Sequence, residues 1–250
     1  MRRRSVFLTL LILIVTFVAV FGFLGYLLKQ EPQFYAGACR DGVGDQLAAS
    51  ELLTRFGDVQ NDIRTARAEW GSSFTAAELN AFFREHLDRS DGLAELLPTG
   101  INSPRVTIIG DRLQIATRYQ YAPFEFLEND FLSTVLSVEL KMWVVSKEQN
   151  TVAVEVCGLW AGALPVSSQR YLDRVSDAAR KWNIDITWYR NNGNPVGLLR
   201  FYADQTRPST FIRTVKIAED KLTIGGRSLL DAIAAPVATE LQPMGTVTKE

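Results

Sequence analysis

Cysteine and histidine are scarce in this chain of 250 residues, which contains two cysteines and a single histidine. These three residues are too few to provide the ligands of a zinc site of the usual cysteine or histidine type. We therefore expect neither a bound metal nor a cofactor.

The motifs of the common catalytic sites are also missing. The sequence has no G-x-S-x-G nucleophile motif and no P-loop, and Gly42-x-Gly44 lacks both a preceding strand and a third glycine. The one histidine, His86, stands beside Glu85 and Asp88, but nothing in the sequence supplies the nucleophile that a general base would serve. We interpret His86 as a solvated helix residue, and we expect no enzymatic activity.

An excess of positive charge is the third feature that the chain lacks. Its formal net charge is −1, and the 222 residues after Leu28 carry 24 basic and 28 acidic side chains. Nucleic-acid binding usually needs a surplus of basic residues that neutralises phosphates. The composition therefore excludes nucleic acid as the expected partner.

One long apolar run dominates what the sequence does contain. Residues Ser5 to Leu28 include no charged side chain, and 19 of these 24 residues are apolar. A helix of this length rises about 36 Å, which is enough to cross a hydrocarbon core about 30 Å thick. The run predicts a single transmembrane helix over 5–28.

The charges that flank this run predict its orientation. Three arginines precede it, whereas its far flank carries only Lys29, answered by Glu31. Because positively charged flanks stay in the cytoplasm, we expect residues 1–4 on the cytoplasmic side of the cell membrane and the bulk of the chain outside it. The residues that set this topology are Arg2, Arg3 and Arg4.

A cleaved signal peptide is the alternative interpretation of the same run. The apolar region of a signal peptide has about 7–15 residues and is shorter than this one. The best cleavage site, Ala36-Gly37-Ala38, also lies about ten residues beyond the run. An uncleaved anchor is therefore favoured.

Outside the cytoplasm Cys39 and Cys157 could form a disulfide. The alternative is that Cys157 is a buried free thiol.

The periodicity of the remaining residues predicts three helices in one domain over 45–230, joined to the membrane helix by a flexible linker over 29–44. Apolar residues recur at helical spacing from Leu52 to Trp70. Thr75 and Glu78 form a capping-box pair that begins a second helix. A third helix is expected over Ser167 to Trp182, with Tyr171, Val175 and Trp182 on its buried side.

Alternating apolar residues predict four antiparallel hairpins in the same domain. Successive hairpins without strand–helix–strand alternation are typical of an α+β fold with an antiparallel meander. The tail over 231–250 has no periodicity and is expected to be loose. The predicted hairpins join 106–108 to 113–115, 136–144 to 152–156, 184–189 to 196–202 and 211–217 to 222–224.

Three of these features occur together in a known family. They are Phe74-Thr-Ala-Ala-Glu-Leu-Asn80, the strand–turn–strand segment from Pro104 to Ile115, and Gly162-Ala-Leu-Pro-Val166 before a helix. In this combination the chain resembles the YpmS-like and related membrane-anchored domains of unknown function, which are similar to tubular lipid-binding proteins. Over about residues 70–200, the resemblance implies a curved antiparallel sheet around a long helix that encloses an apolar groove for acyl chains. It implies no catalytic residue.

The leading hypothesis is therefore a membrane-anchored domain that binds a lipid or another acyl-chain ligand without catalysis. An antiparallel sheet with one apolar face and few covering helices can enclose an apolar cavity, and binding there needs no reactive group. The alternative is a membrane-tethered scaffold with a filled core that docks a protein of the cell envelope. The predicted groove residues are inward-facing strand positions and two residues near one end: Leu136, Val138, Leu140, Val154, Val156, Leu164 and Tyr171.

Overall fold

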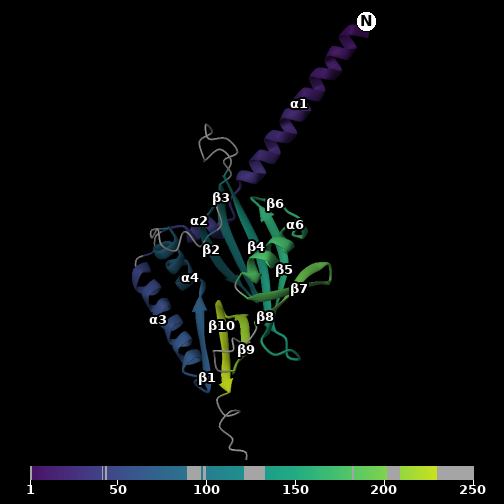
Figure 1. Cartoon of the computed structure of the whole chain (residues 1–250). Helices are drawn as coiled ribbons and strands as arrows, with labels where there is room; N and C mark the ends of the chain where they lie inside the picture. The colour runs from purple at the N-terminus through teal and green to yellow at the C-terminus, as the bar shows by residue number, and fades with distance from the viewer. Residues whose placement is uncertain are drawn as a thin grey trace, which may run out of the picture.

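The computed structural model describes residues 2–40, 42, 44–88, 97, 100–120, 133–181, 183–201 and 209–229. A long N-terminal helix projects from one end of a domain that contains two sheets and shorter helices (Figure 1). This helix, α1, spans Arg2–Lys29 and includes the whole predicted membrane segment. The expectations for Trp182 and for the tail over 231–250 lie outside the described residues.

Most of the shorter helices precede the large sheet in the chain, and α3 and α4 pack against each other. The π-helical turn continues α4 without a break and carries His86. In the described part of the chain these segments are α2 (Gln33–Ala38), α3 (Asp45–Arg64), α4 (Ala76–Phe83), the π-helical turn (Arg84–Asp88) and α6 (Gln169–Arg180).

The larger sheet is antiparallel, with the strand order β2-β3-β4-β5-β8-β7 and the two-residue β6 paired to β5. Its long hairpins supply the broad surface against which the helices pack. Its strands are β2 (Ile101–Ile109), β3 (Arg112–Gln120), β4 (Ser133–Val144), β5 (Thr151–Ala161), β6 (Leu164–Pro165), β7 (Ile184–Asn191) and β8 (Asn194–Phe201).

A smaller antiparallel sheet joins segments from the two ends of the domain. Its order is β1-β10-β9, so β1, which directly precedes α4, pairs with a strand near the end of the described chain. Trp70 and Phe74 are buried on one face of β1 at the two-residue period of a strand. The strands are β1 (Glu69–Thr75), β9 (Ser209–Ala218) and β10 (Lys221–Leu229).

The main core lies between the two sheets and α4. Val106, Ile108 and Leu113 of the large sheet pack with Ile217 of β9, and all four side chains are buried. Leu79 of α4 packs against the same cluster. This core covers one face of the large sheet at the β2–β3 side, because cross-strand partners such as Val106 and Ile115 share a face.

The segment between α1 and α3 packs tightly against the other face of the large sheet. Tyr35 of α2 has no exposed surface and contacts Ala116 and Val135. Its hydroxyl donates a hydrogen bond of 3.0 Å to the carbonyl of Ser103. Burial is the main cause that raises the pKa of Tyr35 to about 12, so the hydroxyl stays protonated and remains a donor.

Two buried arginines hold the end of α2. The carbonyl oxygen of Ala38 accepts hydrogen bonds from Arg84 at 2.6 Å and from Arg105 at 3.1 Å. Arg84 also forms a bidentate ion pair with Asp45 at 2.7 and 2.8 Å, while Arg105 pairs with Asp88. Each guanidinium is therefore neutralised where it is buried, and four segments of the chain meet at one carbonyl.

Asn80 joins α4 to the large sheet. Its side-chain amide donates to the carbonyl of Val106 at 2.7 Å, and its carbonyl oxygen accepts from the N–H of the same residue at 2.8 Å. Both bonds are buried, and together they fix the register of the helix against β2. The sequence-predicted capping box begins this helix, with reciprocal bonds between Thr75 and Glu78.

The coarse fold prediction is confirmed. The protein is α+β, with one N-terminal apolar helix, a large antiparallel sheet and a few helices. All four predicted hairpins are present. The predicted meander is incomplete, because β5 pairs with β8 instead of β7, and β9 and β10 leave the sheet to pair with β1.

Several local predictions were wrong. The expected linker over 29–44 contains α2 and the fully buried Tyr35. The helix expected to reach Trp70 ends at Arg64, since Trp70 pairs with Gly226 in the small sheet. On α6, Leu172 and Ser176 are buried, whereas the predicted buried residues Tyr171 and Val175 are 41% and 46% exposed. The helix α6 therefore turns a different side to the domain than predicted. Trp188 explains the difference, because its indole N–H donates to the Ser176 hydroxyl at 2.8 Å.

Replacing Asn80 with Ala should lower the free energy of unfolding by about 2–4 kcal/mol, because two buried backbone groups of Val106 would lose their partners. Urea unfolding of the full chain in detergent, followed by tryptophan fluorescence, measures this change. The matched control is Asn102→Ala. Asn102 is exposed and its side chain bonds to Gln120, so the substitution should cost less than about 0.5 kcal/mol. Equal losses in the two variants would contradict the role given to Asn80.

Glu78 should make stability depend on pH. Burial alone raises the pKa of Glu78, but the hydrogen bonds from Thr75 and Arg55 outweigh it and hold the pKa below its ordinary value of 4.5. A carboxylate with a lowered pKa stabilises the fold above its ordinary pKa, and this contribution is lost as the pH falls through the lowered value.

Glu78→Gln should therefore cost about 1 kcal/mol of unfolding free energy at pH 7, and its difference from the unmodified chain should shrink below pH 4.5. Unfolding curves recorded across this pH range test the prediction. Glu51→Gln, at an exposed position of α3, is the control and should change little at any pH. A loss that is independent of pH would argue against the linkage.

Candidate functional site

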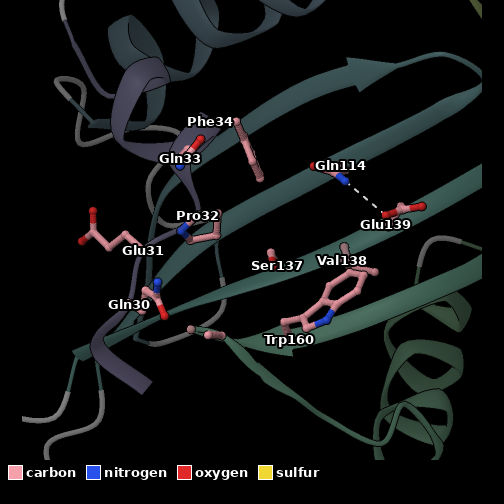
Figure 2. A pocket seen from close by; sticks show the side chains of 12 residues that line it. Gln30, Glu31, Pro32, Gln33, Phe34, Gln114, Ser137, Val138, Glu139 and Trp160 are labelled. Atoms are coloured by element: carbon pink, nitrogen blue, oxygen red, sulfur yellow. Dashed lines mark hydrogen bonds between the residues drawn. The ribbon is translucent and has the colours of Figure 1, made fainter. Parts of the chain in front are cut away.

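A hollow of about 360 Å³ lies where α1 meets the domain. It opens on the face of the large sheet that also packs against α2, and its walls come from the α1–α2 junction and from β3, β4 and β5 (Figure 2). The residues that line it are Gln30, Glu31, Pro32, Gln33, Phe34, Gln114, Ser137, Val138, Glu139, Trp160, Gly162 and Ala163.

Hydrogen bonds to the last turn of α1 fix one side of this hollow. The N–H of Ala163 donates to the carbonyl of Leu27 at 2.9 Å, and the hydroxyl of Thr134 donates to the carbonyl of Leu28 at 2.6 Å. These carbonyls have no partner inside the helix, because a helix leaves its last four carbonyls unbonded. The sheet therefore caps α1, and the helix and the domain meet in a defined geometry.

Gly162 makes this close approach possible. A Cβ atom at this position would lie 2.4 Å from the carbonyl oxygen of Leu27 and 2.5 Å from that of Leu28. The residue also has a φ of +59°, which favours glycine. Its N–H donates to the carbonyl of Val135 at 2.7 Å, so the turn after β5 is tied to β4 beneath the end of α1.

An ion pair strengthens the junction next to the hollow. Arg118 of β3 bonds to Glu31 at 2.6 Å, directly after α1. Both side chains are 37% exposed, so the pair contributes little energy by itself. Its effect is to hold the chain between α1 and Pro32, the N-cap residue of α2, along the edge of the hollow.

Two aromatic side chains and a proline ring form the apolar walls of the hollow. Pro32 and Phe34 stand on the junction side, and the indole of Trp160 lies along β5 across from them (Figure 2). Trp160 adopts this position because Gly158, two residues earlier on the same face, has no side chain. A Cβ atom at Gly158 would lie 2.0 Å from the indole.

Polar groups form the far end of the hollow. Glu139 accepts a hydrogen bond from the Gln114 amide at 3.1 Å (Figure 2). It accepts a second one from Arg112. Its side chain is 13% exposed, and hydrogen bonding to it raises the pKa of Arg112. Near the junction, the side-chain amides of Gln30 and Gln33 have no partner among the residues that the structure describes.

This arrangement suits binding of a molecule with an apolar part and a polar part. Aromatic walls bury apolar groups, while carboxylate and amide groups orient hydroxyl or ammonium groups. The volume is at the lower end of the range of about 300–1,000 Å³ for small-molecule sites. The hollow can therefore hold part of a large amphiphile.

The structure separates most of the predicted groove residues from this hollow. Only Val138 of that set is among its lining residues. The strand positions do share one face of the sheet, since Leu136 pairs with Ala161, Val138 with Leu159, Leu140 with Val156 and Val154 with Met142. Leu164 pairs with Ala161 beside them, and Tyr171 lies exposed on α6. The hollow lies on the opposite face, where Ser137 pairs with Trp160.

The possible disulfide is not formed, because Cys39 and Cys157 are both free thiols. Cys39 packs beside Tyr35 at the end of α2, whereas Cys157 lies in the irregular pairing of β5 with β4. Burial, followed by the nearby carboxylate of Glu155, raises the pKa of Cys157. This shift opposes formation of a reactive thiolate.

His86 packs against Phe82, with 5.0 Å between the ring centroids. Among the described residues, no group of three or more histidine, cysteine, aspartate or glutamate side chains could hold a metal ion.

Sequence reasoning missed Phe34, Gln114 and Glu139 as site residues. Phe34 stood in the supposed linker, and the two polar residues looked like the solvated face of a hairpin. The available signal was the pattern Gly158-Leu-Trp160, where a glycine two residues before a tryptophan leaves room for the indole.

Comparison of the chain with protein-family models, curated proteins and solved structures finds no match. The resemblance to YpmS-like and tubular lipid-binding domains therefore stays a prediction.

Gly162→Ala should loosen the contact between α1 and the domain, because a methyl group cannot fit against the carbonyls of Leu27 and Leu28. We expect amide hydrogen exchange across 159–166 to rise about tenfold, which corresponds to a loss of about 1.4 kcal/mol. Mass spectrometry of the exchanged full chain measures it.

Gly110→Ala is the matched control for Gly162→Ala. Gly110 has a similar φ of +62°, but nothing lies within 4 Å of its added Cβ. It therefore reproduces the backbone strain without the steric contact. Unchanged exchange across 159–166 in Gly162→Ala, or an equal rise there in Gly110→Ala, would contradict the proposed docking.

Proposed function

We propose that the protein is a single-pass membrane protein whose extracytoplasmic domain binds part of a membrane lipid in the hollow at the end of α1. The observation that carries this proposal is the position of an aromatic and polar hollow directly after an apolar helix. Binding of this kind needs no catalytic group.

The composition and exposure of α1 support its role as an anchor. Leu11–Lys29 has a mean hydropathy of 2.7, and none of it is buried against the domain. An apolar helix of this length that is exposed over most of its surface is stable in a bilayer and unfavourable in water. The arginines before it favour a cytoplasmic N-terminus.

The packing of α2 supports retention of the anchor over its cleavage. Cleavage after Ala38 would remove Tyr35, which is completely buried and bonded to Ser103. It would also break the chain at the carbonyl that Arg84 and Arg105 share. The mature domain would then lose part of its own interior, which is not expected of a signal peptide.

With α1 in the bilayer, the hollow lies at the membrane–water interface. Tryptophan favours this zone because its ring is apolar and its N–H is polar. An acyl chain or glycerol backbone can lie against Trp160, Phe34 and Pro32 while the remainder of the lipid stays in the bilayer. Glu31 and Glu139 line the hollow, whereas their partners Arg118 and Arg112 are not among its lining residues, so a neutral or zwitterionic headgroup with hydroxyl or ammonium donors fits better than an anionic one.

Exposed apolar residues on α6 favour a second candidate function, the membrane-tethered scaffold. Tyr171 and Val175 lie one helical turn apart and are 41% and 46% exposed. Such a pair could contact a protein of the cell envelope. The lipid hypothesis remains the better supported one, because the hollow is a formed concave site and this helix face is convex.

Trp160→Ala should reduce the amount of lipid that stays bound to the full-length protein about tenfold, because an aromatic contact is worth about 0.5–1.5 kcal/mol beyond its buried area. Native mass spectrometry of the protein, released from nanodiscs of phosphatidylethanolamine and phosphatidylglycerol, measures the retained lipid. We expect one phosphatidylethanolamine molecule to be retained in preference to phosphatidylglycerol.

Trp143→Ala is the matched control for this experiment. Trp143 lies near the far end of β4, nine residues and about 30 Å along the strand from Thr134, which contacts α1. It should leave lipid retention unchanged. Absence of retained lipid in the unmodified protein, or equal loss in both variants, would refute lipid binding at the hollow and favour the scaffold.

A further inference from the structure

The small sheet lies at the end of the domain opposite α1 (Figure 1). A second concave surface lies on this sheet. This hollow measures about 600 Å³ and is mainly polar. Three arginines line it, Arg67, Arg213 and Arg227, together with the acidic residues Asp62 and Glu69. It shares no residue with the hollow at the end of α1.

Its floor is bare backbone. Gly71 of β1 pairs with Gly225 of β10, which pairs with Thr214 of β9, so two of the three strands present no side chain in this row. A Cβ atom at Gly71 would lie 3.0 Å from the Cα of Gly225. Glycine inside a strand often marks a place where a ligand approaches the backbone closely.

An irregularity in the sheet places Arg213 beside this floor. The pairing of β10 with β9 shifts between Gly225 and Gly226, and Arg213 is the unpaired residue of β9 at that point. Such a bulge redirects a side chain and bends the strand. Arg227 follows immediately on β10, so two guanidinium groups flank the glycine row.

A third hollow, of about 560 Å³, adjoins the polar hollow on the small sheet, because Arg213 and Arg227 line both. Its other wall is the β4–β5 turn, which contributes Lys147. Asn150 fixes this turn against β9 by donating to the carbonyl of Thr210 at 2.7 Å and accepting from the N–H of Ile212 at 2.9 Å. The two hollows therefore form one elongated surface with cations at its centre and at both ends.

Two of the acidic residues around this surface form ion pairs, and one of these pairs neutralises Arg67 at the end of the surface. Both carboxylate oxygens of Asp62 bond to Arg67 at 3.2 Å, and Glu148 bonds to Arg200 at 3.2 Å. Within the described part of the chain, Arg213, Arg227 and Lys147 have no acidic partner, although Glu69 stands opposite Arg227 in the sheet. The centre of the elongated surface is therefore positively charged in a protein whose net charge is −1.

We infer that this elongated surface binds an extended anion that carries several phosphate groups in a row. Guanidinium groups bind phosphate oxygens in a bidentate manner, and an ammonium group adds a point charge. Arg213 and Arg227 bind the central phosphate over the glycine floor, and Lys147 binds a neighbouring one. The surface lies away from α1, so the phosphates come from a soluble or polymeric ligand and not from a lipid beside the helix.

Isothermal titration of the full-length protein in detergent with sodium tripolyphosphate tests this inference. We expect binding that weakens with added salt, and at least tenfold weaker binding in the double variant Arg213→Gln, Arg227→Gln. Orthophosphate should bind at least tenfold more weakly than tripolyphosphate, because it cannot reach both hollows. Circular dichroism establishes that each variant is folded.

Arg174→Gln is the matched control, since Arg174 is an exposed arginine on α6 that lines neither hollow. It should leave tripolyphosphate binding unchanged. No binding at low salt, equal weakening in Arg174→Gln, or tighter binding of hexaglutamate than of tripolyphosphate would each overturn the phosphate site. Addition of phosphatidylglycerol vesicles should not compete, and effective competition would reassign the surface to lipid headgroups.

Discussion

Two buried arginines share the carbonyl oxygen of Ala38, and this contact holds the N-terminal segment against the large sheet. Arg84 and Arg105 are 8% and 3% exposed, and the carboxylates of Asp45 and Asp88 supply the opposite charges that offset the cost of burying the two guanidinium groups. The carbonyl is an end group of a short helix, and it gains the donors that the helix cannot provide. Through it, α2, α3, the π-helical turn and β2 are positioned together.

The position of α1 depends on this contact at the carbonyl of Ala38. Because Ala38 and Tyr35 are fixed, the short chain that precedes them must start near the beginning of β4 and the turn after β5, where Thr134 and Ala163 cap α1. The hollow forms in the space between this returning chain and the sheet. The hollow therefore exists because the connection between α1 and α3 packs against the large sheet, although its composition is that of a flexible linker.

The two concave surfaces of the protein differ in chemistry and in position. The hollow at the end of α1 combines aromatic walls with carboxylates, which favours an amphiphile without net negative charge. The elongated surface on the small sheet has a backbone floor and unpaired cations, which favours phosphate. On the two proposals made above, the protein would hold a lipid near the bilayer while it contacts a soluble anionic polymer at the other end of the domain.

Features that arise from neighbouring residues are predictable from the amino-acid order alone: the apolar run, the capping box of Thr75 and Glu78, and the four hairpins with their alternating strands. Local periodicity and turn chemistry are sufficient for these. Long-range packing sets three further features: Trp70 enters a strand, α6 buries Ser176, and Trp160 and Phe34 line one hollow. Each of these outcomes depends on partners that are distant in the chain, and an amphipathic pattern specifies a face without specifying what will cover it.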